Sequence, residues 1–148
     1  MKDAPVMIIK NKNNEFLLLK RTPDHKLFPN EWCLPGGKRE LSYESQSKES
    51  FGFSWKHAQP TYSESNEEAI YRECEEELGC KIHVFEEMSI HMIDDHYKMK
   101  VYVAATNDIT ITKEFPNREH VTFGWFDVDN LPKELSKITR ELLETYEF

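Results

Sequence analysis

The feature that most constrains this chain is an acidic run just before a glycine, Arg72-Glu73-Cys74-Glu75-Glu76-Glu77-Leu78-Gly79-Cys80. It puts four carboxylates into five positions. Like charges at such spacing repel one another and weaken an isolated helix. A fold that contains this segment must therefore leave the carboxylates in water or supply a cation for them.

The residues around the acidic run predict a helix over 66–78. This segment contains no Pro or Gly. Ser65, followed three residues later by Glu68, forms a capping-box pattern that begins a helix. Gly79 stands where a glycine commonly ends one.

The helical period then separates the acidic residues into two groups. At about 100° per residue, the apolar stripe consists of Ile70, Cys74 and Leu78. Glu73, Glu76 and Glu77 lie together on the arc beside that stripe, whereas Glu75 points away. The three clustered carboxylates either form a solvated acidic face or converge on one point.

Composition narrows the classes of protein that this chain can belong to. Its 148 residues suit a single domain with a real core. A formal net charge of −8 argues against binding nucleic acid or an anionic membrane through a basic surface. Cys33, Cys74 and Cys80 form no CxxC and are interpreted as small buried residues in a reducing cytosol. Residues 1–10 contain no long apolar core, so no signal peptide is expected.

Hydrophobic patterning predicts a mixed sheet with helices packed on its faces. The continuous apolar run 16–19 predicts a central strand that is covered on both sides. Residues 11–14 form the turn of the hairpin before it. Strands are predicted at 6–10, 15–20, 31–34, 81–93, 98–106, 109–113 and 121–127, and a final helix at 133–146.

The chain resembles the Nudix hydrolase family. The segment Glu64-x7-Arg72-Glu73-Cys74-x-Glu76-Glu77-x-Gly79-Cys80 is similar to the second part of the Nudix box, and Trp32-Cys33-Leu34-Pro35-Gly36-Gly37-Lys38-Arg39-Glu40 resembles the first part. Phe16-Leu17-Leu18-Leu19-Lys20-Arg21 and Trp125-Phe126-x4-Leu131-Pro132 look like the family's strand before the loop and its last strand and helix start. The resemblance spans nearly the whole chain and implies a Nudix-type α/β/α sandwich with a mixed β-sheet.

One departure from the family pattern falls inside the box. Gly37 and Glu64 are separated by 26 residues where the family has five, an insertion of about 21 residues. Such an insertion loops out at modest entropic cost, so the loop and the helix are still expected to meet. The segment at about 41–63, which alternates at Phe51, Phe53 and Trp55, is predicted to be a strand or hairpin. Four roles stay open for it: a lid, a substrate wall, a homodimer contact, or a surface hairpin without a role in chemistry.

The resemblance implies an enzyme that hydrolyses the pyrophosphate linkage of nucleoside diphosphate derivatives with Mg²⁺, for which Mn²⁺ substitutes. Cleaving a pyrophosphate means attacking phosphorus ringed by negative oxygens, and hard divalent cations neutralise that charge and activate water. By family analogy, Arg72 holds the helix carboxylates in place. The predicted metal-binding residues are Gly36, Gly37, Glu64, Glu73, Glu76 and Glu77.

The general base varies across the family and is often a glutamate outside the box. Glu119 and Glu114, on the loop before the last strand, are the candidates, and Glu119 is preferred. Arg21, at a strand end near the Pro-Gly-Gly loop, is a predicted phosphate contact. Lys38 and Tyr97 are further predicted substrate contacts.

The substrate preference rests on Tyr97, 17 residues past Cys80. Some family members that act on dinucleoside polyphosphates carry a tyrosine there, so diadenosine polyphosphates are preferred, with ADP-ribose and FAD as further substrates. The alternative is a nucleoside triphosphate pyrophosphohydrolase of the sanitation type, which releases a nucleoside monophosphate and pyrophosphate. A third reading is a non-catalytic nucleotide sensor. The expected protein is cytoplasmic, binds no nucleic acid or membrane, and takes a small nucleotide as its partner.

Overall fold

The computed structural model describes residues 2–3, 5–26, 28–36, 41–42, 61–62, 65–80, 85–94, 97–105 and 109–145, and side chains for 5–26, 28–36, 65–80 and 109–145. The elements in chain order are β1 (Lys2–Asp3), β2 (Val6–Lys10), β3 (Phe16–Arg21), β4 (Trp32–Cys33), β5 (Leu41–Ser42), β6 (Thr61–Tyr62), α2 (Asn66–Leu78), β7 (Phe85–Asp94), β8 (Tyr97–Ala105), β9 (His120–Phe126) and α3 (Lys137–Thr145).

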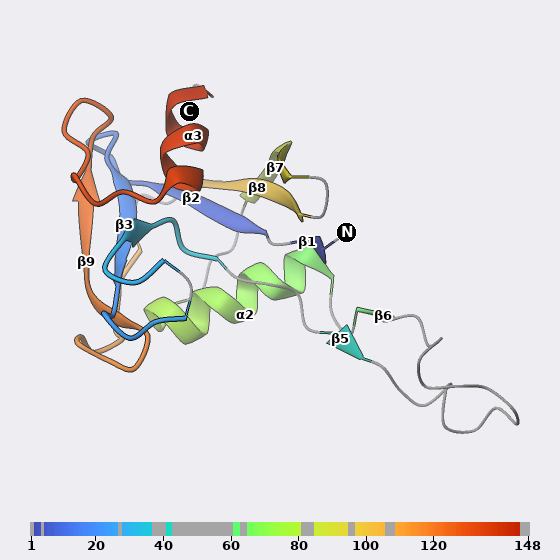
Figure 1. The fold of residues 1–148 in the computed structure, drawn as a ribbon, viewed down its shortest axis with the longest axis horizontal. Helices are drawn as coiled ribbons and strands as arrows, with labels where there is room; N and C mark the ends of the chain where they lie inside the picture. Colours follow the sequence, from blue (N-terminus) through green and yellow to red (C-terminus); the bar gives the residue numbers. More distant parts are fainter. Residues whose placement is uncertain are drawn as a thin grey trace, which may run out of the picture.

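The main sheet is mixed, as the sequence predicts. β2 pairs with β8 in parallel and with β3 in antiparallel orientation. β3 also pairs antiparallel with β4 and with β9, so it is hydrogen-bonded on both edges. β7 and β8 form the long antiparallel pair at the other side of the sheet (Figure 1).

Strict alternation along β2 and β3 divides the core into two clusters. Successive side chains of a strand point to opposite faces of the sheet. One face carries Met7, Ile9, Leu17 and Leu19, and α2 covers it with Ile70, Cys74 and Leu78. The other face carries Val6, Ile8, Phe16 and Leu18, and α3 covers it with Leu142 and Leu143. The two helices therefore lie on opposite faces of the sheet, which confirms the predicted sandwich (Figure 1).

Helix α2 begins and ends where the sequence predicts. Glu68 N donates to Ser65 Oγ at 3.1 Å, and Ser65 N donates to Glu68 Oε1 at 3.2 Å, so the capping box is complete. Gly79 adopts a left-handed conformation with φ of 67° and donates its N–H to Glu75 O. A side chain at Gly79 would collide with Thr112 Oγ1, which is 2.4 Å from the position of a Cβ.

Near the C-terminus one predicted strand was wrong, and the predicted final helix is confirmed with a later start. Residues 109–113 were predicted to be a strand but have no strand pairing. Instead, Thr112 N and Lys113 N both donate to Leu78 O, and Ile109 and Ile111 pack on the core under α2. The final helix was predicted from residue 133 but begins at Lys137, because Ser136 Oγ accepts the Thr139 N–H and so caps it.

The insertion within the box has paired ends. Leu41 lies opposite Tyr62 and Ser42 opposite Thr61, in an antiparallel pair. The remainder of the predicted strand or hairpin, including Phe51, Phe53 and Trp55, lies outside the described residues.

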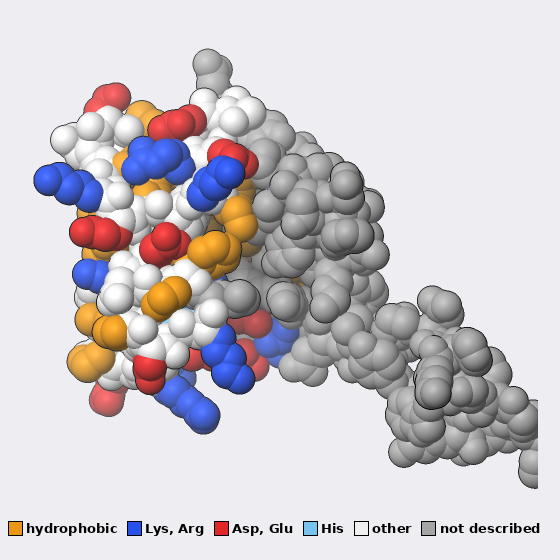
Figure 2. Space-filling model, in the orientation of Figure 1, with side chains coloured by type: hydrophobic (Ala, Val, Ile, Leu, Met, Phe, Trp, Pro, Cys, Tyr) orange, Lys and Arg blue, Asp and Glu red, His pale blue; other side chains and the backbone are white. Residues whose placement is uncertain are grey.

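The surface carries charges of both signs. On the face shown in Figure 2, Lys and Arg side chains alternate with Asp and Glu over the coloured residues, and no single-sign patch stands out among them. Among the described residues, no helix is both long and apolar enough to cross a membrane.

Candidate active site

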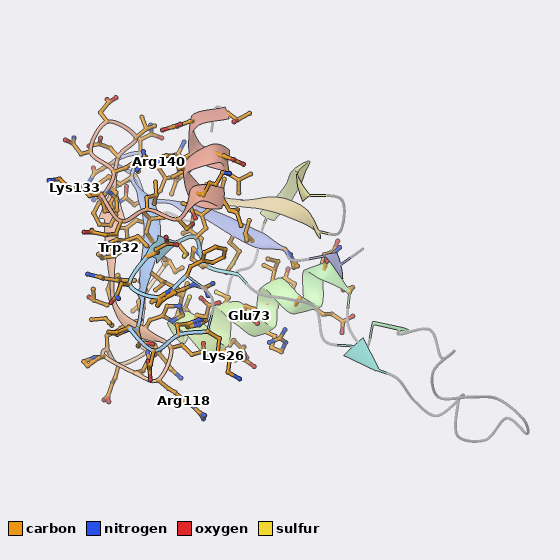
Figure 3. All side chains as sticks on the ribbon, in the orientation of Figure 1. Lys26, Trp32, Glu73, Arg118, Lys133 and Arg140 are labelled. Carbon is orange, nitrogen blue, oxygen red and sulfur yellow. The ribbon has the colours of Figure 1, made fainter. Side chains whose placement is uncertain are left out.

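The four carboxylates in the C-terminal half of α2 differ in how deeply they are buried. Glu75 and Glu76 are exposed, Glu73 is half-buried, and Glu77 is only 6% exposed. The carboxyl groups of Glu73 and Glu77, one helical turn apart, are close enough for each to shift the pKa of the other. Figure 3 labels Glu73 near the middle of α2. Two carboxylates of the predicted set thus converge, as the helical period indicates, and Glu75 lies outside the pair.

The Pro-Gly turn contacts Glu77 through a backbone N–H group. Gly36 N lies 3.3 Å from Glu77 Oε1 and donates to it. Gly36 also bridges to Val6, and a Cβ at Gly36 would lie 2.6 Å from Pro5 O and 2.7 Å from Val6 Cα. Only glycine allows this approach. The first and second parts of the box therefore meet, although 28 residues separate Gly36 from Ser65.

The pair is electrostatically strained. Burial raises the pKa of Glu77 well above its ordinary value, and the Glu73 carboxyl adds to this shift, against the Gly36 N–H that lowers it. Burial also raises the pKa of Glu73, although the interaction of its carboxyl with Glu77 and the charge of Arg72 oppose that shift. Glu77 also lies in the last turn of α2, near the negative end of the helix dipole, and that turn contains no basic residue. These effects disfavour ionisation of both carboxyl groups in the absence of a cation.

Arg72 contacts two of the helix carboxylates. Its Nη1 lies 2.8 Å from Glu73 Oε1 and 3.1 Å from Glu76 Oε2. Glu76 therefore faces Arg72, with its side chain 57% exposed, while Glu77 faces the core. These contacts are the ones that an orienting arginine requires.

His120 is a neighbour of Glu77 that the sequence analysis missed. It opens β9, is 6% exposed, and places Nε2 3.8 Å from Glu77 Oε2. Burial, then the charges of Arg21 and His25, lower the pKa of His120 to about 4, so the imidazole is neutral at pH 7. The β3–β9 register sets it opposite Arg21. Only that non-local pairing reveals its direction, since Glu119-His120 alone does not say which of the two points inward.

Arg21 and Glu119 lie on the same side of the fold as the pair. Arg21 places Nη1 3.2 Å from His25 Nδ1, and its guanidinium lies 5.8 Å from the centre of the Phe28 ring. Glu119 is exposed, and its charge contributes to raising the pKa of Glu77. The other candidate base, Glu114, is exposed on the same loop.

The remaining predicted site residues cannot be placed in the same way. Gly37, Lys38 and Glu64 lie outside the described residues. Tyr97 opens β8, but its side chain is outside the described set.

The donor set near Glu77 fits a hard divalent cation in its chemistry. Glu73 and Glu77 offer carboxylate oxygens, which Mg²⁺ prefers. Within the described residues, no three or more His, Cys, Asp or Glu side chains form a ready metal cluster. Glu64 and Gly37, both in the predicted ligand set, lie outside the described residues, so that set stays a prediction.

Comparison with known proteins gives the family. A NUDIX domain profile matches residues 1–146. The nucleoside triphosphatase NudI of Escherichia fergusonii is 27% identical over 154 residues, covering 92% of this chain and 89% of that protein. The MutT NUDIX hydrolase structure from Burkholderia pseudomallei superposes with a TM-score of 0.68 at 25% identity, covering 99% of this chain and 98% of that one. DR0079 from Deinococcus radiodurans gives 0.70 at 19% identity, covering 97% and 82%, a likeness of fold alone.

The chain belongs to the Nudix hydrolase family. It is a Nudix pyrophosphohydrolase, an enzyme of a family that typically depends on divalent metal ions. The predicted α/β fold and the predicted enzyme class are confirmed.

Proposed function

We propose that this enzyme is a Mg²⁺-dependent nucleoside triphosphate pyrophosphohydrolase that releases a nucleoside monophosphate and pyrophosphate. The observation that carries the chemistry is the neighbouring pair of half-buried Glu73 and buried Glu77, with Glu77 held by the Gly36 N–H. The choice of substrate is supported by two relatives, one named a nucleoside triphosphatase and the other a MutT hydrolase. Diadenosine polyphosphates, the preference drawn from the sequence, rest on Tyr97 alone and are less well supported.

The residues of this chain divide the work of the reaction. A divalent cation bound at Glu73 and Glu77 would neutralise phosphate charge and lower the pKa of attacking water. Arg72 orients Glu73 and Glu76. Glu119 is the proposed base that takes the proton of the attacking water, and the bond that breaks is a phosphorus–oxygen bond of the anhydride. Arg21, at the end of β3, is the proposed phosphate contact, together with Lys38.

A substrate panel tests the proposal. The purified protein is assayed with Mg²⁺ or Mn²⁺ on ribo- and deoxynucleoside triphosphates, oxidised dGTP, diadenosine polyphosphates, ADP-ribose, FAD and NADH, with products identified by chromatography. The expected result is the highest kcat/KM on a nucleoside triphosphate, with pyrophosphate as a product. A higher kcat/KM on diadenosine polyphosphates, or release of orthophosphate alone, would overturn the substrate assignment.

The same assay includes a matched pair of variants on α2. Glu73→Gln removes one member of the buried pair, whereas Glu75→Gln removes an exposed carboxylate two residues away. Loss of activity in the first variant and retention in the second links turnover to this site. Equal activity in both would place catalysis elsewhere.

A further inference from the structure

The loop that carries Glu119 is fixed to α2 at its start. Thr112 N and Lys113 N lie 3.0 and 3.1 Å from Leu78 O, and Thr112 Oγ1 donates to Gly79 O at 2.6 Å. Leu78 directly follows Glu77. The loop therefore starts from a point tied to the helix end that holds the carboxylate pair.

The far end of the loop lies against Glu77 and is bonded to the residue that follows β3. His120 is buried against Glu77, with 3.8 Å between Nε2 and Oε2. Thr22 N, at the end of β3, donates to Glu119 O at 3.1 Å. The loop is thus held beside the site both before and after the turn that contains Glu119. The conformation of that turn then decides where Glu119 lies.

Asn117 closes that turn with its side chain and its backbone. Its Oδ1 accepts the N–H groups of Glu119 at 3.1 Å and His120 at 3.0 Å. Its Nδ2 donates to Glu114 O at 2.9 Å, and its backbone N donates to His120 O at 2.9 Å. An amide is the side chain that supplies both an acceptor for two N–H groups and a donor for a carbonyl. No other residue of the loop has its side chain bonded to the backbone of Glu119 within the described part of the chain.

We propose that Asn117 is a positioning residue that sets the direction of the Glu119 carboxylate relative to the Glu73–Glu77 pair. Asn117 touches no reacting atom and acts through Glu119, so the inference rests on the proposed role of Glu119 as the base. Small displacements of a catalytic group lower the rate sharply while leaving substrate binding intact. Loss of Asn117 therefore lowers kcat and leaves KM nearly unchanged.

The chain offers a matched control in Asn11. In the hairpin between β2 and β3, Asn11 Oδ1 accepts the N–H groups of Asn13 at 2.9 Å and Glu15 at 3.0 Å, and its backbone N donates to Glu15 O at 3.0 Å. As in Asn117, the side-chain oxygen accepts two backbone N–H groups, but Asn11 Nδ2 donates to Glu15 Oε1 at 2.9 Å and not to a backbone carbonyl. The hairpin lies at the Phe16 end of β3, whereas the site lies at the Arg21 end. Asn11→Ala therefore removes an equivalent turn closure away from the chemistry.

The test is a double-mutant cycle of Asn117→Ala and Glu119→Gln, measured on the best substrate of the panel. Glu119→Gln is expected to lower kcat by about 10²- to 10⁴-fold, as loss of a general base does. Asn117→Ala is expected to lower kcat by roughly 10- to 100-fold, with KM changed less than about twofold. In the Glu119→Gln background, Asn117→Ala is expected to change kcat by less than about twofold, because the group it positions is gone.

Two further variants separate positioning from stability. Asn117→Ala and Asn11→Ala are expected to lower the thermal midpoint by similar amounts, yet only the first lowers kcat. Asn117→Asp keeps the oxygen that accepts the Glu119 and His120 N–H groups. Its kcat is therefore expected to be close to that of the wild type and higher than that of Asn117→Ala. A full additional loss from Asn117→Ala in the Glu119→Gln background would overturn the positioning role and leave the base assignment standing. Full activity of Glu119→Gln would overturn both.

Discussion

Helices α2 and α3 cover opposite faces of one sheet, yet they bury different kinds of polar group. In α3 the buried polar residue is Thr139, whose hydroxyl oxygen accepts the Leu34 N–H at 3.2 Å and the Ser136 hydroxyl at 2.8 Å. In α2 the buried polar residues are Asn66 and Glu77, and Glu77 is an acid whose pKa is raised by burial and by a second carboxyl, that of Glu73. The Thr139 hydroxyl is neutral and hydrogen-bonded, so its burial is compatible with a stable core.

The buried acid destabilises the helix that carries it, and a chain selected for stability alone would replace it. The contrast agrees with the proposal that the α2 side of the sheet also serves to bind a cation, whereas the α3 side serves the fold. Four experiments test this contrast between the two faces of the sheet.

The largest expected effect is on activity. Glu77→Gln removes the carboxylate that is aimed at the Gly36 N–H and paired with Glu73, and kcat/KM should fall by at least about 100-fold, comparable to loss of a preorganised charged group. Glu144→Gln, on the exposed face of α3, should leave kcat/KM unchanged. Steady-state kinetics on both variants measures the difference, and near-equal values would mean that the two helices do not differ in function.

The next effect is on stability and should be similar on the two faces. Ile70→Ala on the buried side of α2 and Leu142→Ala on the buried side of α3 each truncate a side chain that is 0% exposed. Each should lower the free energy of unfolding by about 2–5 kcal/mol. Because the sheet separates the two clusters, the double variant should be additive within about 0.5 kcal/mol. Urea unfolding tests this, and strong coupling would show that the two clusters form one core.

A smaller effect appears in the pH dependence of stability without divalent cations. The pKa of Glu77 is raised in the folded state, so above about pH 4.5 the unfolded chain gives up its proton first and stability falls as pH rises. The pKa of His120 is lowered to about 4, so its contribution to stability rises with pH between about 4 and 6.5. Glu77→Gln should keep the rising part and reduce the fall, of which the raised pKa of Glu73 leaves a remainder.

Thermal midpoints in a chelating buffer from pH 4 to 8 check this prediction. Adding Mg²⁺ at pH 8 should raise the midpoint of the wild type, because a ligand that binds only the folded state stabilises it. The rise should be absent in Glu77→Gln. A wild-type stability that does not fall with pH would show that the acid pair ionises without penalty.

The smallest effect concerns the two N-caps. Ser65→Ala and Ser136→Ala each remove a hydroxyl that accepts a backbone N–H, and each should lower the free energy of unfolding by about 1 kcal/mol. Ser136 is buried and also bonds Thr139 Oγ1, so its loss should be the larger. Chemical denaturation resolves this order, and the reverse order would mean that the capping box of α2 matters more than burial.

Local signals in the sequence were sufficient for much of this structure. Ser65, Glu68 and Gly79 mark the ends of α2 because caps are made by neighbours in sequence. The apolar run 16–19 identifies the central strand because burial on both sides leaves no polar alternation. The late start of α3 was missed because Leu131-Pro132 resembles a helix start, while the hydroxyl that caps the helix belongs to Ser136.

Non-local contacts decided the rest. The helical period put Glu73, Glu76 and Glu77 on one arc, but which of them is buried depends on how closely Gly36 approaches. That Ile109 and Ile111 pack under α2 without pairing as a strand depends on the bonds from Thr112 and Lys113 to Leu78. The inward direction of His120 follows from the register of β9 against β3. These contacts join residues that are far apart in the sequence, so hydrophobic periodicity does not predict them.

The short ladder between β5 and β6 bears on how this protein can vary in evolution. Leu41 and Tyr62, 21 positions apart in the chain, are direct partners, so their Cα atoms stand about 5 Å apart, as in any antiparallel pair. A change in the number of residues between them is therefore expected to leave the approach of Gly36 to Glu77 in place. The length of this segment can then vary among relatives without displacing the carboxylates of α2.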